Sequence, residues 1–147
     1  MIDIISQLPY KKPFLFVESI DSIDESGVDG SYTFKKDEYF YEGHFPGNPL
    51  TPGVILTEVA AQIGLVSLGI FLKSSSNESE VVPVFSSANV DFLKPVYPGD
   101  KVRVVSKKQY FRFGKLKCSF EMSNGQEEII CKGELSGMIV ERSENAA

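Results

Sequence analysis

The only histidine of the 147-residue chain, His44, lies in Gly43–Gly47, where two glycines and a proline are typical of a loop. A histidine packed in a protein core would be expected on a periodic apolar face, and His44 is not on one. Imidazole is the side chain best suited to moving protons near neutral pH, so His44 is a candidate general base. The spacing alone leaves open a structural role, in which His44 is merely hydrogen-bonded within a turn.

Glu58 is a carboxylate within the longest apolar stretch of the chain, residues 54–72. Removing a carboxylate from water disfavours its charged form, so we expect the pKa of Glu58 to be raised and the group to serve as an acid. Gln62 follows one helical turn later and is placed to orient the carboxylate by a hydrogen bond. The alternative left open is that Glu58 caps the helix or reaches solvent from its first turns.

The backbone at Gly53 and Val54 begins the same helix. Free N–H groups and the positive end of the helix dipole at this position favour negative charge developing on an oxygen. A histidine base, a protonated carboxyl group and an oxyanion site together suit removal of an α-proton from a thioester and expulsion of a β-hydroxyl. Dehydration is therefore one chemistry that these residues permit.

These groups must be positioned by one long helix over residues 54–72, with Thr51 as N-cap and Pro52 as its first residue. A stretch of nineteen residues is also long enough to cross a membrane, but Glu58 and Gln62 on one face of it argue against a membrane span. A helix that is apolar on almost every face is better explained as buried inside a wrapping sheet.

The remaining pattern predicts an α+β domain in which one curved antiparallel sheet wraps the helix. We expect a single domain over residues 1–140, followed by a disordered tail, 141–147. The other predicted elements are a short helix at 2–8, a hairpin of 14–17 with 28–34 around a loop at 21–27, an ordered loop at 39–53, a polar connection at 74–80, and strands at 81–92, 101–111, 115–122 and 129–140.

Composition excludes several classes of protein. Fifteen Lys and Arg against twenty Asp and Glu give a formal net charge of −5, which argues against nucleic-acid binding. Neither Cys118 nor Cys131 has a second ligand at metal-binding spacing, so we expect no metal site and reduced thiols in a cytoplasmic protein. The first residues lack the basic region and long apolar core of a secretory signal, so no export is expected.

Residues 43–62, Gly-His-Phe-Pro-Gly-Asn-Pro-Leu-Thr-Pro-Gly-Val-Ile-Leu-Thr-Glu-Val-Ala-Ala-Gln, closely resemble the signature of the 3-hydroxyacyl-acyl-carrier-protein dehydratases that use a His/Glu pair. Residues 8–17 are similar to the N-terminal segment of that family, and residues 92–100 to its Pro-Val-x-Pro-Gly-Asp turn. The resemblance covers nearly the whole chain and weakens only in the last strands.

The resemblance implies a hot-dog fold, paired into a homodimer with two active sites at the interface, and leaves assembly beyond the dimer open. It implies that His44 acts at C2 and the 3-hydroxyl of a (3R)-3-hydroxyacyl-acyl-carrier protein, giving the trans-2-enoyl product. Glu58 of the opposite protomer would complete the site. Gly53, Val54 and Gln62 are the residues expected around the oxyanion and substrate.

The same resemblance implies no metal and no organic cofactor, since the substrate is carried on the phosphopantetheine of the acyl carrier protein. The acyl chain would follow an apolar tunnel beside the helix, where Leu65, Leu68 and Phe71 are its expected lining. Neither acyl length nor unsaturation follows from the sequence. Glu58 in place of the Asp typical of dehydratase-isomerases disfavours isomerase activity.

The chain departs from the family at three places. It has Tyr10-Lys11-Lys12 where the family commonly has His-Arg, and Asp91 and Leu93 where arginines are common. These departures make a specialised pathway, such as aryl polyene or polyketide-like lipid synthesis, a candidate beside housekeeping fatty-acid synthesis. A thioesterase and a non-catalytic acyl-binding protein are the alternative functions on this fold.

Charge along the sequence suggests where an acidic carrier protein would dock. Residues 94–117 hold eight Lys and Arg against the single acid Asp100. Lys107, Lys108 and Arg112 are therefore the predicted docking residues, steering the carrier by electrostatic attraction. The alternative is that these side chains are the solvated faces of two strands, where lysine also discourages aggregation.

Overall fold

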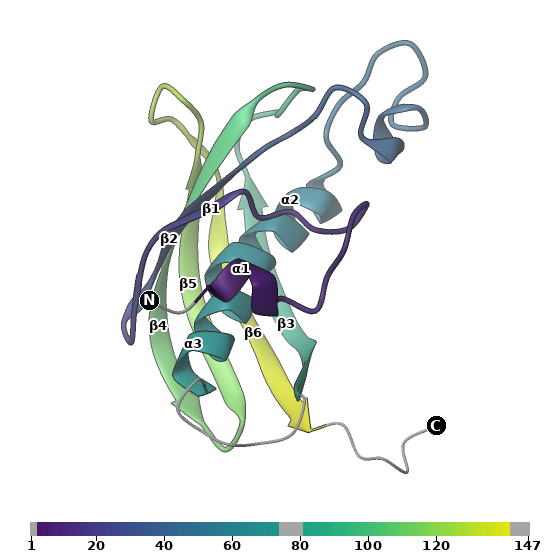
Figure 1. Cartoon of the computed structure of the whole chain (residues 1–147). Coiled ribbons are helices and arrows are strands. Elements are labelled where there is room, and N and C mark those ends of the chain that lie inside the picture. The colour runs from purple at the N-terminus through teal and green to yellow at the C-terminus, as the bar shows by residue number, and fades with distance from the viewer. Residues whose placement is uncertain (1–2, 74–80, 142–147) are drawn as a thin grey trace.

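The computed structural model describes residues 3–73 and 81–141 of the chain. Figure 1 shows one long helix lying against the inner face of a curved sheet. The elements in chain order are α1 (Ile4–Gln7), β1 (Ser19–Asp24), β2 (Gly27–Thr33), the 3-10 helix η1 (Tyr39–Tyr41), α2 (Gly53–Ala61), the π-helical turn η2 (Gln62–Val66), α3 (Ser67–Lys73), β3 (Val81–Phe92), β4 (Lys101–Arg112), β5 (Lys115–Ser123) and β6 (Ile129–Glu141).

The six strands form one sheet in the order β1-β2-β4-β5-β6-β3, and all neighbouring strands are antiparallel. Alternate residues of the central strands point inward, so Val102 and Val104 of β4 and Leu116 of β5 are buried beneath the helix. The predicted α+β arrangement, the sheet around a helix of a hot-dog fold, is confirmed.

The segments α2, η2 and α3 form one continuous helix, residues 53–73, close to the predicted 54–72. It is long and apolar enough to cross a membrane, but 72% of its most apolar window is buried inside the protein. Val59, Ile63 and Leu68 are fully buried against the sheet. The helix is therefore the core of the domain.

The π-helical turn η2 was not part of the prediction. The carbonyl of Gln62 accepts hydrogen bonds from both the backbone N–H and the Oγ of Ser67, the latter at 2.7 Å. A π turn accommodates one extra residue and so changes which side chains continue a helix face.

The predicted hairpin exists, but its first strand is β1, residues 19–24, and not residues 14–17. The expected loop at 21–27 is mostly strand, because the chain turns tightly between Asp24 and its partner Gly27. Residues 14–16 are extended without joining the sheet, since their backbone is hydrogen-bonded to the side chain of Gln62 instead.

Smaller differences concern the ends of elements. The helix begins at Gly53, so Pro52 is its N-cap and not its first residue, and the expected N-cap Thr51 instead pairs its hydroxyl with the Tyr41 hydroxyl at 2.6 Å. The strands β3 to β6 begin where predicted and end within one residue of it. β6 continues to Glu141, the first residue of the expected tail, while residues 142–147 and the expected connection at 74–80 lie outside the described residues.

Candidate active site

The loop that carries His44 is closed by backbone hydrogen bonds. The His44 carbonyl accepts from the Leu50 N–H at 2.8 Å, and the His44 N–H donates to the Phe40 carbonyl at 3.1 Å. Within the loop, Phe45 and Asn48 exchange two backbone hydrogen bonds, at 3.2 and 2.8 Å. The backbone on both sides of His44 is thus fixed although the loop surface is exposed.

The His44 ring has a defined orientation. Its Nδ1 lies 2.8 Å from the Leu50 carbonyl oxygen, and the ring stacks on Phe45 with 4.2 Å between centroids. A carbonyl oxygen only accepts, so Nδ1 carries the proton of the neutral ring and Nε2 keeps a lone pair. His44 is therefore arranged to accept a proton at Nε2.

Glu58 lies half-buried on α2, where it accepts a hydrogen bond from Gln62 Nε2 at 2.9 Å. Burial raises the pKa of Glu58, and the hydrogen bond from Gln62 opposes that shift. The predicted hydrogen bond between these two side chains is present. A carboxyl group in this environment holds its proton to higher pH than an exposed one and can act as an acid.

Gln62 itself is fully buried and has no polar atom free for a substrate. Its Nε2 also donates to the Phe14 carbonyl at 3.0 Å, and its Oε1 accepts from the Phe16 N–H at 2.8 Å. Gln62 therefore joins Glu58 to the extended segment at residues 14–16. No local sequence pattern indicates this second role of Gln62, because its two partners are more than 40 residues away along the chain.

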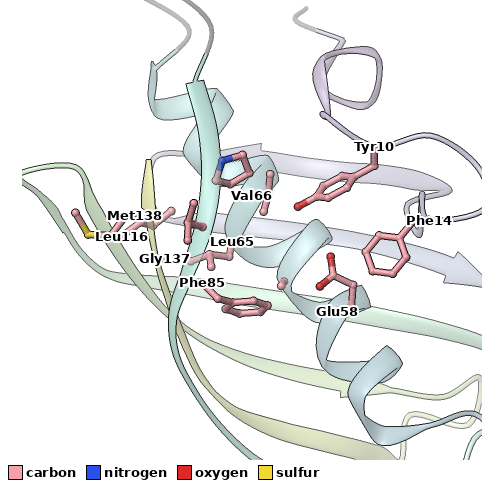
Figure 2. A pocket seen from close by; sticks show the side chains of 12 residues that line it. Tyr10, Phe14, Glu58, Leu65, Val66, Phe85, Leu116, Gly137 and Met138 are labelled. Atoms are coloured by element: carbon pink, nitrogen blue, oxygen red, sulfur yellow. The ribbon is translucent and has the colours of Figure 1, made fainter. Parts of the chain in front are cut away.

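A cavity of about 250 Å³ opens beside Glu58, between the helix, the segment before β1, and strands β3, β5 and β6. Figure 2 shows Glu58 and Phe14 at one end of it and Leu116 and Met138 at the other. Tyr10 and Phe14 were not among the predicted site residues. The lining residues are Tyr10, Phe14, Glu58, Ala61, Leu65, Val66, Pro83, Val84, Phe85, Leu116, Gly137 and Met138.

Of the three residues expected to line an acyl tunnel, Leu65 alone lines this cavity. Leu68 is fully buried in the core, and Phe71 lines a separate groove with residues of α1 and β1. The helix residues that line the cavity are Glu58, Ala61, Leu65 and Val66, and the last of them is also the last residue of the π turn, which accommodates one extra residue in the helix.

The N-terminus of α2 has no side-chain cap, because its N-cap is Pro52. The first N–H groups of the helix, including those of Gly53 and Val54, are left for an external acceptor. A Cβ added to Gly53 would lie 3.3 Å from the Phe92 ring, so the backbone here is closely flanked by an aromatic side chain. The Val54 side chain is 77% exposed, which leaves an apolar group beside this helix end uncovered.

His44 is not among the residues that line the Glu58 cavity. Figure 1 shows the loop between β2 and α2, which carries His44, projecting beyond the N-terminal end of the helix. One copy of the chain therefore holds His44 and Glu58 in different places.

The three predicted docking residues do not share one surface. Lys107 and Arg112 lie on the outer face of β4, whereas Lys108 is paired with the buried Cys118 and points to the other face. The local basic excess is also smaller than the sequence suggested, since strands far apart in sequence bring acids to it. The resulting ion pairs are Lys94–Glu128, Arg103–Asp29 and Lys117–Glu134.

Metal-binding groups do not gather in the described part of the chain, where no three His, Cys, Asp or Glu side chains come together. Cys118 and Cys131 are buried and unpaired, and burial raises the pKa of each thiol to about 12. Both are therefore unreactive thiols of the core.

Comparison with known proteins adds sequence evidence to this geometry. An ApeI-like family model, described as ApeI dehydratase, matches residues 20–134. The chain is 35% identical to the 3-hydroxyacyl-acyl-carrier-protein dehydratase FabZ of Wolbachia pipientis subsp. Culex pipiens, over 86% of this chain and 87% of that protein. It is 36% identical to the FabZ of Caldicellulosiruptor saccharolyticus, over 90% and 92% respectively.

Two solved structures share the fold at low sequence identity. The dehydratase heterocomplex ApeI:P from Xenorhabdus doucetiae matches with a TM-score of 0.76 at 13% identity, over 98% of this chain and 93% of that one. A hypothetical thioesterase with coenzyme A from Streptococcus pneumoniae matches with a TM-score of 0.59 at 14% identity, over 85% and 88%. These likenesses concern the fold alone.

Proposed function

The chain belongs to the family of ApeI-like dehydratases, and from this premise we propose that His44 and Glu58 carry out its two proton transfers. The protein is a 3-hydroxyacyl-acyl-carrier-protein dehydratase of fatty-acid or specialised lipid synthesis. The observation that carries the proposal is the half-buried carboxyl of Glu58, oriented by Gln62, at one end of an apolar cavity.

In the proposed reaction, His44 Nε2 removes a proton from C2 of the substrate. The electrons of that C–H bond form the C2–C3 double bond while the C3–O bond breaks. Glu58 gives its proton to the departing oxygen, which leaves as water. The N–H groups at Gly53 and Val54 donate hydrogen bonds to the thioester carbonyl oxygen and stabilise the negative charge that develops on it. Proton exchange through water then returns His44 and Glu58 to their starting states.

The acyl chain occupies the cavity beside Glu58 in this proposal. Apart from Glu58 and Tyr10, the side chains that line it offer only apolar surface, which suits a hydrocarbon chain. The thioester and the phosphopantetheine arm of the carrier protein would lie toward the His44 loop. No group other than the protein's own residues is required for the proton transfers.

The separation of His44 from the cavity supports a homodimer with composite sites. The free edge of β3 has no partner strand within the described chain, and Val84 and Phe85 on it are about half exposed while they also line the cavity. A second copy covering this edge would close the cavity and bring its own His44 loop to Glu58. We also propose a cytoplasmic location, which keeps the two core thiols reduced.

The function is tested by incubating the pure protein with a series of 3-hydroxyacyl-carrier proteins and following the loss of water by mass spectrometry. We expect His44→Ala and Glu58→Gln to lower turnover by about 100-fold or more while the circular dichroism spectrum is unchanged. Near wild-type turnover by either variant would remove that residue from the mechanism. Release of free thiol would identify a thioesterase, and binding without turnover would identify an acyl-binding protein.

A further inference from the structure

The cavity beside Glu58 contains a second oxygen that the proposed mechanism does not use. Among its lining side chains, only Glu58 and Tyr10 carry oxygen. Tyr10 comes from the segment before β1 and packs against Phe14, with 6.3 Å between ring centroids. Figure 2 shows its hydroxyl pointing into the cavity, on the wall nearest Val66.

The Tyr10 hydroxyl differs from the other buried phenols of the protein. The Tyr32 hydroxyl donates to Glu38, and the Tyr41 hydroxyl pairs with Thr51. Across residues 3–73 and 81–141, no side chain or backbone group forms a hydrogen bond with the hydroxyl of the half-buried Tyr10. No buried side-chain oxygen in the described residues lacks a partner, so the Tyr10 hydroxyl is still reached by water, and an acceptor on the occupant of the cavity would take the place of that water.

The location of Glu58 indicates which atom of the substrate could accept a hydrogen bond from Tyr10. Burial, together with the nearby charge of Glu58, raises the pKa of Tyr10 to about 12, so the phenol remains a hydrogen-bond donor at physiological pH. The substrate atom next to Glu58 is the 3-hydroxyl oxygen, to which Glu58 gives its proton. A hydroxyl oxygen has two lone pairs, so it can accept from two donors at once.

We propose that the Tyr10 hydroxyl donates a hydrogen bond to the 3-hydroxyl oxygen of the substrate and thereby selects acyl chains that carry this group. The inference rests on the proposed function, because it places the 3-hydroxyl at Glu58. Tyr10 is then a substrate-binding residue that holds the leaving oxygen while Glu58 protonates it. A saturated acyl chain of the same length offers no acceptor and gains nothing from Tyr10.

The test compares how two ligands bind to the His44→Ala protein with Tyr10 intact and to the same protein carrying Tyr10→Phe. The His44→Ala change is present throughout, so that the substrate is bound and not consumed. The ligands are a 3-hydroxyacyl-pantetheine and the saturated acyl-pantetheine of equal chain length, titrated by calorimetry. We expect Tyr10→Phe to weaken binding of the 3-hydroxyacyl ligand by about five- to tenfold, the effect of losing one hydrogen bond. Binding of the saturated ligand should change by less than about twofold.

Phe14→Leu is the matched control, because Phe14 lines the same cavity without a polar atom. It should change the affinity for both ligands by the same factor. Equal effects of Tyr10→Phe on both ligands, or no effect on either, would overturn the proposal. Turnover by the protein with His44 intact is measured separately, so an absent dehydratase activity is distinguishable from an absent Tyr10 contact.

Discussion

A single buried amide connects the acid of the site to the rest of the protein. Gln62 donates to Glu58 and to the Phe14 carbonyl, and accepts from the Phe16 N–H. The same side chain therefore orients the carboxyl group and anchors the segment that forms one wall of the cavity. A change at Gln62 would disturb both at once, because a buried amide with three partners leaves three groups unpaired when it is removed.

The burial of Glu58 predicts how stability depends on pH. Its pKa in the folded protein lies above the ordinary value of 4.5, so the folded state binds this proton more tightly than the unfolded chain. The resulting contribution to stability is fully present below the unfolded pKa and is lost as pH rises through the folded pKa. We expect Glu58→Gln, which has no such proton, to become progressively more stable relative to wild type as pH rises from the ordinary carboxyl pKa of 4.5 through the raised pKa of the folded protein.

Melting temperatures of both proteins across this pH range check the prediction. The difference should favour the variant most at the alkaline end, where wild-type Glu58 is a half-buried anion. A difference that stays constant from acid to alkaline pH would contradict it.

At the scale of elements, the π turn lies unusually close to the sheet. A Cβ added to Gly64 would lie 2.9 Å from the Cβ of Ser106 on β4, whose Oγ donates to the Gly64 carbonyl. Gly64→Ala gains about 1 kcal/mol of helix propensity, but forcing the helix from the sheet costs about 1–3 kcal/mol. We expect a net loss in the free energy of unfolding, measured by urea denaturation.

Ser106 provides the control for that prediction. In the Gly64→Ala background, Ser106→Gly removes the clashing Cβ and should recover part of the lost stability. Ser106→Ala loses the same hydrogen bond but keeps the Cβ, so it should recover none. Equal stability of these two double variants would show that the clash is not the cause.

The elements could be predicted where local pattern and tertiary structure agree. The long helix follows from its apolar run, and the last four strands follow from alternation that matches the inner face of the sheet. Residues 14–17 have the same strand-like pattern, but a side chain 46 residues away takes their backbone hydrogen bonds. The π turn has no local signature either, and Leu68 beyond it is fully buried in the core.

The site shows the same division. His44, Glu58 and Gly53 belong to one contiguous motif, so the sequence alone is enough to propose them as site residues. Tyr10 could not be proposed in the same way, because its place in the cavity depends on how the N-terminal segment crosses the helix. The three predicted docking residues are close in sequence, but strand alternation places Lys108 on the opposite face of β4 from its neighbour Lys107.

For the whole molecule, composite sites predict recovery of activity in mixed dimers. His44→Ala and Glu58→Gln subunits are each expected to be inactive alone. Random mixing should give up to about a quarter of wild-type activity, because half of the dimers are mixed and each regains one of two sites. Purification through a different tag on each co-expressed subunit retains only the mixed dimers, which should then give up to about half of wild-type activity. Mixed dimers without activity, or active monomers in light scattering, would contradict the prediction.

The charges on the outer face of β4 predict where the carrier protein docks on this protein. Lys107 and Arg112 share the outer face of β4, and reversing both to Glu should raise the KM for a carrier-bound substrate. A small pantetheine substrate should be unaffected, and the effect on the carrier should weaken with salt. Lys108→Glu is the matched control on the opposite face and should have the smaller effect. Equal losses on both substrates would assign these charges to stability of the fold.

The π turn also marks the end of the helix segment that borders the cavity, because both end at Val66. From Glu58 to Val66 the helix runs beside the cavity over nine residues, about 12 Å for eight steps of ~1.5 Å each, and no described helix residue beyond Val66 lines the cavity. In the proposed complex, the acyl chain can therefore lie beside the helix only from Glu58 to the end of the π turn. A substitution that moves the end of the π turn requires no change at His44 or Glu58. The acyl-chain length that the protein accepts and the reaction that it performs can therefore evolve separately.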